Sequence, residues 1–195
     1  MIATALLMAG LSGCYVPLDF YAEVEIDRSG YYKMAFDGYL AWAPLYQKLR
    51  KGTLTPSEEK KEVAIIETDL KRDPAVGEVR YMGRGRFKVD WRTSGDLMKT
   101  KMVSFVRRNE NMLSLKFLKK EKEMVLSGTS VSRTRAKQLT DIGLNITGEL
   151  KVRTDARVVS HNATSVVKNG VRERIYIWKI RSAFDPAPNL VIAVR

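Results

Sequence analysis

Apolar and polar residues alternate through most of this chain, and this two-residue period is the feature that most constrains its fold. One face of the segment 19–27 carries only apolar side chains, those of Phe20, Ala22, Val24 and Ile26. Successive side chains of a β-strand point to opposite faces, so the pattern predicts a half-buried strand. A turn sequence follows at 27–30, and the period resumes with Tyr32, Met34 and Phe36. The two segments predict an opening β-hairpin.

The same period returns from residue 77 onward. It is found near Val79 and over 86–92, 102–106, 113–117, 124–126, 146–153, 166–167, 175–180 and 190–194. Gly83-Arg84-Gly85 marks a turn or bulge between two of these segments. Asn169-Gly170 lies between apolar runs, which is a strong hairpin signal. Most of the chain is therefore expected to form antiparallel sheet.

Three segments have helical character instead. Pro44 suits the first turn of a helix that Gly52 ends. A second helix is expected after Thr55-Pro56-Ser57-Glu58, which has the pattern of a capping box. This helix carries an apolar stripe formed by Val63, Ile66 and Leu70. A third, short helix is expected between Ser132, as its cap, and Gly143.

These patterns predict an α+β fold: one domain over residues 14–195, with a mainly antiparallel curved sheet and two or three helices packed on one face. The chain has 195 residues, 45% of them hydrophobic and 29% charged, which is enough for one domain with a sizeable core. Neither a repeat nor a long linker divides it. We therefore expect a single folded unit.

The first fourteen residues differ from the rest. The apolar run 2–11 leads into Leu11-Ser12-Gly13-Cys14, which contains the only cysteine of the sequence. The run is too short for a spanning helix, which needs about 20 apolar residues. The segment resembles the signal peptide of bacterial lipoproteins, in which a small residue precedes a cysteine that becomes acylated. It departs from that pattern in one respect, since no Lys or Arg precedes the apolar run.

This resemblance implies that 1–13 is a signal peptide, cleaved after Gly13, and that Cys14 carries a diacylglyceryl and acyl anchor, such as palmitate. The mature protein is then expected to be anchored to the membrane in the cell envelope, facing the periplasm or the exterior. Tyr15 rather than an aspartate follows the cysteine. In a Gram-negative host this resembles the sorting signal for the outer membrane.

The net charge of +12 favours contact with anionic surfaces. Outside the cytoplasm these surfaces are phospholipid headgroups, glycolipids and acidic envelope polymers, so nucleic acid is not expected as a partner. A basic surface beside a lipid anchor supplies the second signal that stable membrane attachment often needs. The alternative is that the charge only keeps the protein soluble. The candidate anion-contacting residues form the 80–92 basic cluster: Arg80, Arg84, Arg86, Lys88 and Arg92.

Residues that carry catalytic chemistry are scarce. His161 is the only histidine, so it has no second histidine or internal cysteine with which to form a metal set. Ser160 is its neighbour in the sequence, and adjacent strand residues point to opposite faces. Asn162 is expected to stabilise a turn. We therefore expect no enzyme activity, no cofactor and no bound metal.

The order of the elements resembles that of the mycobacterial LppM-like envelope lipoproteins. The resemblance depends on the early hairpin after Cys14, on the segment 158–163 before a second hairpin, and on Tyr176-Ile177-Trp178 in its returning strand. It implies a curved sheet with packed helices, binding of a lipid or glycolipid, and no catalytic residues.

The functional expectation is a non-enzymatic lipoprotein that binds an amphipathic anionic envelope molecule. An apolar cavity between sheet and helices would hold its acyl chains, and basic strand residues would contact its headgroup. The alternative is an accessory interaction subunit whose basic face docks on an acidic protein of an envelope assembly.

Overall fold

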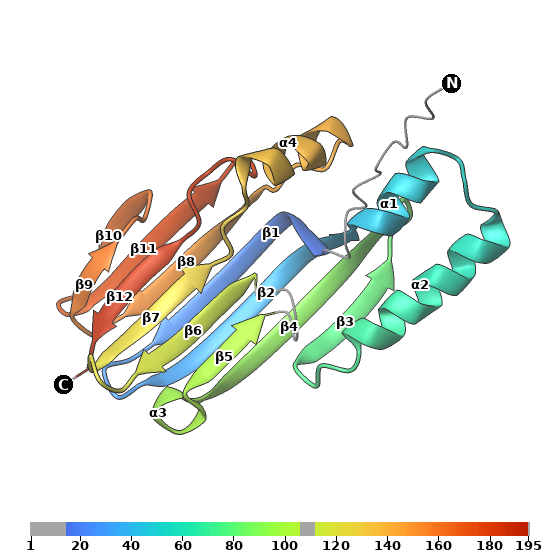
Figure 1. The fold of residues 1–195 in the computed structure, drawn as a ribbon. Coiled ribbons are helices and arrows are strands. Elements are labelled where there is room, and N and C mark those ends of the chain that lie inside the picture. The colour runs from blue at the N-terminus through green and yellow to red at the C-terminus, as the bar shows by residue number, and fades with distance from the viewer. Residues whose placement is uncertain (1–14, 106–111, 195) are drawn as a thin grey trace.

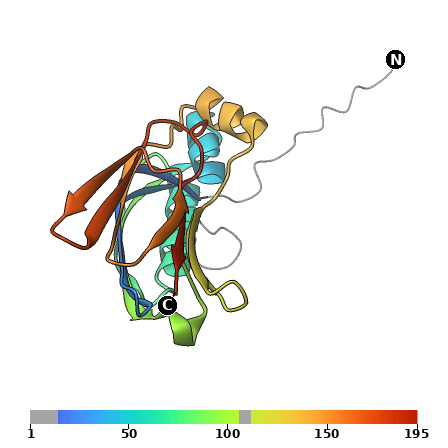
Figure 2. The same ribbon diagram turned by 90° about the vertical axis from the view of Figure 1, so that its left-hand side faces the viewer.

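The computed structural model describes residues 15–105 and 112–194, and its strands form two sheets. Figure 1 shows the sheets from one side, and Figure 2 shows them face to face, with one hairpin projecting from the body. The α+β class and the single domain predicted from the sequence are confirmed. The predicted sheet, however, is divided into two layers. The signal peptide 1–13 and Cys14 lie outside the described residues.

The larger sheet has the strand order β10-β11-β8-β1-β2-β4-β3. All its neighbours pair antiparallel except β1 and β8, which run parallel. Its strands are β1 (Tyr15–Ile26), β2 (Tyr31–Trp42), β3 (Val76–Tyr81), β4 (Arg86–Asp96), β8 (Gly148–Thr154), β10 (Ser165–Asn169) and β11 (Glu173–Ile180). The predicted opening hairpin is β1 and β2, and Ala22, Val24 and Ile26 are buried on its inner face.

The smaller sheet has the order β5-β6-β7-β12-β9 and is antiparallel throughout. Its strands are β5 (Met102–Phe105), β6 (Leu113–Leu118), β7 (Glu123–Gly128), β9 (Val158–His161) and β12 (Asn189–Ala193). Buried residues from both sheets belong to one core cluster, in which Phe36 and Trp91 of the larger sheet meet Phe105 of the smaller one. The second sheet, more than the helices, therefore covers the inner face of the first.

The helices of the described chain are α1 (Ala43–Arg50), α2 (Pro56–Leu70), α3 (Leu97–Thr100) and α4 (Arg133–Asp141). The predicted capping box begins α2: the Glu58 amide donates to Thr55 Oγ1 at 3.3 Å, and the Thr55 amide donates to Glu58 Oε2 at 2.8 Å. The helix lies beside β3 at the sheet edge, whereas α1 and α4 lie at the end where β1 begins (Figure 1). None of the helices in the described ranges is long and apolar enough to cross a bilayer.

The predicted turn between β3 and β4 is a tight one. Gly83, Arg84 and Gly85 all have positive φ, and the Met82 amide donates to the Arg86 carbonyl at 2.8 Å. Gly85 is required there, because a Cβ atom would lie 2.7 Å from the backbone nitrogen of Tyr46 in α1. The glycine therefore lets α1 pack directly against the turn.

Candidate functional site: an apolar cavity between the sheets

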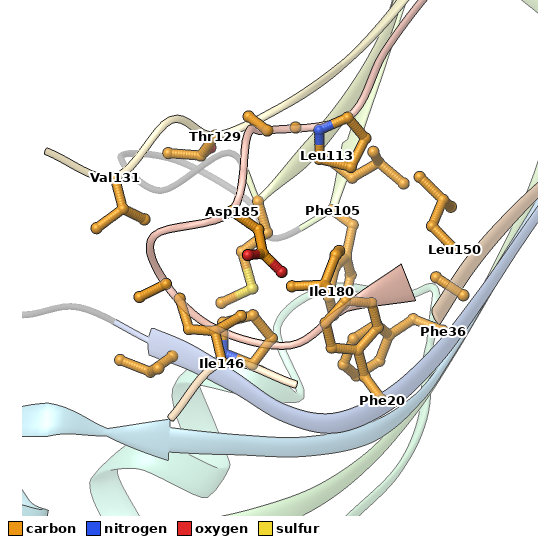
Figure 3. A pocket seen from close by; sticks show the side chains of 18 of the residues that line it. Phe20, Phe36, Phe105, Leu113, Thr129, Val131, Ile146, Leu150, Ile180 and Asp185 are labelled. Atoms are coloured by element: carbon orange, nitrogen blue, oxygen red, sulfur yellow. The ribbon is translucent and has the colours of Figure 1, made fainter. Parts of the chain in front are cut away.

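A cavity of about 340 Å³ lies between the two sheets (Figure 3). Its volume is at the lower end of the range of ligand pockets, about 300–1,000 Å³. Most of its described lining is apolar. The lining includes Tyr15, Val16, Pro17, Phe20, Ala22, Phe36, Phe105, Leu113, Val131, Ile146, Leu150 and Ile180, together with residues 182–183 and 185–188.

Stacked aromatic rings connect the two sheets at one wall of the cavity. The centroids of Phe20 and Phe36 are 5.7 Å apart, and those of Phe36 and Phe105 are 4.3 Å apart. Trp91 meets Phe105 at 5.1 Å. Offset aromatic pairs of this kind add about 0.5–1.5 kcal/mol beyond the area that they bury. Phe36 and Trp91 of the larger sheet thus contact Phe105 of the smaller sheet at this wall.

A β-bulge and two glycines position Phe20. The register of β1 against β2 shifts between Leu18 and Tyr21, and Asp19 within this bulge has a φ of 44°. Thr147 fixes the bulge, because its hydroxyl donates to Asp19 Oδ1 at 2.6 Å. A Cβ atom at Gly38 would lie 2.6 Å from Phe20 Cβ, and one at Gly148 would lie 2.5 Å from the Phe20 ring. The neighbouring strands thus leave room for this ring at the cavity wall.

A few polar groups lie in the same lining. Arg135 of α4 is its one basic side chain among the described residues, and Thr129, Ser182 and Asp185 supply oxygens. The Asp185 carboxylate, seen among the lining side chains in Figure 3, accepts from the Arg181 amide at 2.7 Å. It therefore fixes the turn that begins the segment 181–188. The lining therefore combines a mostly apolar surface with a few polar groups, which is suited to an amphipathic molecule.

Asn162 fixes the C-terminal end of the segment 181–188. Its Oδ1 accepts from the indole nitrogen of Trp178 and from the amide of Asn189, each at 2.8 Å. Its Nδ2 donates to the Ala187 carbonyl at 2.8 Å. The expectation of a turn role is too narrow, because Asn162 ties β11 of the larger sheet to the start of β12 in the smaller one. The neighbouring His161 accepts the Ala163 amide at Nδ1, 3.2 Å away, and its ring contacts Tyr176.

The 80–92 basic cluster lies on β3, β4 and the turn between them. Arg80 and Lys88 are direct partners across the two strands. Acidic side chains pair with three of its members: Arg80 with Glu78, Lys88 with Asp37, and Arg92 with Asp90. Arg84 and Arg86 lie at the end of the sheet where β1 begins, since Arg86 is the partner of Ala41 and Tyr15 that of Trp42. Anion contact by the cluster stays a prediction, and the acidic neighbours reduce its local excess of charge.

The sequence predicted an apolar cavity but not the residues that line it. Phe20 and Ala22 were predicted to be buried, but an apolar residue that faces a void has the same alternation as one that faces a filled core. The segment 181–188 carries no regular period, and its part in the cavity depends on Asn162 and Asp185. Within the ranges 15–105 and 112–194, no cluster of three or more histidine, cysteine or acidic side chains could hold a metal ion.

Comparisons with known proteins give matches among solved structures. No protein-family model matches the chain, and no curated protein matches its sequence. Among solved structures, the chain is similar to the folded domain of Mycobacterium tuberculosis LppM, determined by NMR, with 13% sequence identity and a TM-score of 0.45. The match covers 91% of this chain and 90% of that one.

Proposed function

We propose that this protein is a membrane-anchored bacterial lipoprotein, not an enzyme, that binds an amphipathic anionic envelope molecule, a lipid or glycolipid, by its acyl chain. The observation that carries the proposal is the apolar cavity between the sheets, about 340 Å³ in volume. An acyl chain has no polar group to satisfy, so it suits a lining of aromatic and aliphatic side chains. Arg135, in the same lining, would attract the anionic headgroup.

An anchor at Cys14 would lie close to the cavity. Tyr15, Val16 and Pro17 line the cavity and directly follow that cysteine in the sequence. An acylated Cys14 would therefore hold this end of the domain at the bilayer surface, where an acyl chain can enter. Arg84 and Arg86 lie at the same end of the sheet. Each cation near an anionic bilayer contributes about 1 kcal/mol to attachment.

The anchor is tested by intact mass and membrane fractionation of the protein from a bacterial host, beside the variant Cys14→Ser. We expect the mature chain to begin at acylated Cys14 and to sediment with membranes, and we expect Cys14→Ser to abolish both properties. A soluble, unmodified chain would remove the anchor and reopen cytoplasmic anions as partners.

The cavity is tested in the Cys14→Ser protein, by mass spectrometry of extracted lipids and by titration with a fluorescent fatty acid. Val131→Trp places a large ring at the half-buried edge of the cavity. Val171→Trp is the matched control, since Val171 is 94% exposed at a hairpin tip. We expect Val131→Trp to weaken binding about tenfold or more and the control to leave it unchanged. Absence of bound lipid, or equal effects of the two variants, would reject the cavity as the site.

An accessory interaction subunit is the second candidate, and β10 favours it. This strand forms an edge of the larger sheet, and all its residues are exposed. Unpaired edge strands accept a further strand from a partner. Val166 and Val167 lie there beside Lys168, which suits an acidic partner with an apolar strand. A stoichiometric partner recovered by pull-down, and lost with Val166→Glu, would favour this function over lipid binding.

A further inference from the structure

Four arginines line a second cavity, at the end of the domain opposite to Tyr15. Its volume is about 530 Å³, and we call it the arginine pocket. Its lining is Arg28, Asp155, Ala156, Arg157, Val158, Arg172, Arg174, Tyr176 and Ala193. These residues come from the β1–β2 turn, the β8–β9 connection, the β10–β11 hairpin and the end of β12. The fold therefore gathers four cations that are scattered along the sequence.

Two of the four guanidinium groups have protein partners. Arg28 Nε donates to Asp155 Oδ2 at 2.7 Å, and the Arg28 amide donates to Asp155 Oδ1 at 3.1 Å. Arg174 Nη1 donates to the Glu173 carbonyl at 2.9 Å. These contacts fix two walls of the pocket. Asp155 neutralises Arg28, so the charge that remains belongs to the other arginines.

The side chains of Arg157 and Arg172 have neither a hydrogen bond nor an ion pair with any residue of 15–105 or 112–194. Both residues are exposed at the mouth of the pocket. An arginine presents its donors in a planar fork that matches two oxygens of a phosphate. Two such forks facing one cavity therefore leave donors for an anionic group from outside the chain.

Tyr176 adds a neutral donor to the same wall. Its side chain is only 7% exposed, and within the described part of the chain its hydroxyl has no hydrogen-bond partner. Burial raises the pKa of Tyr176, although the charge of Arg174 lowers it, so the hydroxyl stays protonated at neutral pH. The hydroxyl lies in the lining of the pocket and keeps some contact with solvent, so it can donate to a ligand oxygen there.

We propose that the arginine pocket binds a phosphate-bearing molecule through Arg157, Arg172 and Tyr176. A phosphomonoester carries about 1.5 to 2 negative charges at pH 7, which matches the two guanidinium groups that have no partner. Phosphate binding by the arginine pocket requires neither the cavity between the sheets nor the anchor, and only the source of the phosphate rests on the proposed anchor at Cys14.

Its position favours a phosphate in solution over a headgroup of the anchoring bilayer. β1 has 12 residues and runs from Tyr15 to the turn that holds Arg28. An extended strand of this length spans roughly 35 Å. An anchor at Cys14 would therefore place the arginine pocket on the far side of the domain from that bilayer.

The test is a calorimetric titration of the full-length protein with inorganic pyrophosphate. The variant is the double substitution Arg157→Gln and Arg172→Gln. Its matched control is Arg133→Gln with Arg181→Gln, which removes two exposed charges from the opposite end of the domain. We expect pyrophosphate to bind, the pocket variant to weaken binding about tenfold or more, and the control to change it less than about twofold.

Three outcomes would overturn the proposal. In the first, pyrophosphate fails to bind at concentrations up to millimolar. In the second, the two double variants weaken pyrophosphate binding equally, which indicates only nonspecific charge. In a parallel arm, vesicles that contain phosphatidylglycerol bind through Arg157 and Arg172 whereas pyrophosphate does not, which assigns the pocket to a bilayer surface. Circular dichroism of each variant checks that its fold is intact.

Discussion

Asn162→Ala provides a direct test of how the two sheets are joined. The amide makes three hydrogen bonds, to the Trp178 indole, the Asn189 amide and the Ala187 carbonyl, each 2.8 Å long. A typical hydrogen bond contributes about 0.5–1.5 kcal/mol, and exposed ones lie at the lower end. Trp178 is only 3% exposed, so its indole N–H would lose its partner in a nearly buried position. We expect a loss of about 2 kcal/mol in the free energy of unfolding.

Urea denaturation followed by tryptophan fluorescence measures this loss. With a urea dependence of about 1–3 kcal/mol/M, the midpoint should fall by about 1 M. Asn145→Ala is the matched control, because Asn145 Nδ2 makes a single exposed hydrogen bond, to the Arg181 carbonyl at 3.2 Å. That control should lose about 0.5 kcal/mol. Equal small losses in the two variants would refute the view that Asn162 ties the sheets together.

Three further predictions concern single side chains. Burial raises the pKa of Asp155, but hydrogen bonds and charge from Arg28 lower it by more, so the net shift is downward. The stability that this shift gives is present above the ordinary pKa near 3.9 and is lost as pH falls. Wild type should therefore lose more stability than Asp155→Asn between about pH 5 and about pH 3, which urea titrations at each pH measure. Burial, aided by the hydrogen bond to Glu59, raises the pKa of Tyr81 to about 12. The stability that this gives is present below about pH 10 and is lost as pH rises through the folded value, and an ultraviolet titration of Tyr81→Phe should lack the late phenolate absorbance. Gly85→Ala should cost about 1–3 kcal/mol more than Gly83→Ala in thermal unfolding. Both residues have positive φ, but only Gly85 has a neighbour within 4 Å of the added Cβ; equal losses would contradict the close approach to Tyr46.

Local elements were predictable because their causes are local. The capping box of α2 lies within four consecutive residues, and the Asp27–Gly30 turn connects two strands with the same period. The parallel pairing of β1 with β8 has no local signal, since Glu23 pairs with Lys151 across more than a hundred residues. Alternation shows that one face of a strand is buried, but it does not show which layer covers that face. The second sheet therefore emerged only from the structure.

The two groups of basic residues show the same difference between local and long-range causes. The 80–92 basic cluster was visible because its members are close in sequence, and yet strand pairing brings Asp37 to Lys88 from a distant segment. The arginine pocket was invisible for the opposite reason. Arg28 and Arg172 are separated by most of the chain, and the fold gathers them at one end. In a β-sheet protein, charge density along the sequence therefore does not show which charges the fold brings together.

Strand direction places the apolar cavity and the arginine pocket at opposite ends of the domain. β1 and β8 run parallel, and β11 runs antiparallel to β8. Tyr15, Gly148 and Ile180 therefore share one end, and the residues after Ile26 and before Glu173 share the other. Side chains such as Val24 and Val152 are buried in the interior between the sheets, and no described residue lines both cavities. A ligand at either end acts on the other only through the strands, so Val131→Trp should leave pyrophosphate binding intact, and the Arg157 and Arg172 substitutions should leave fatty-acid binding intact.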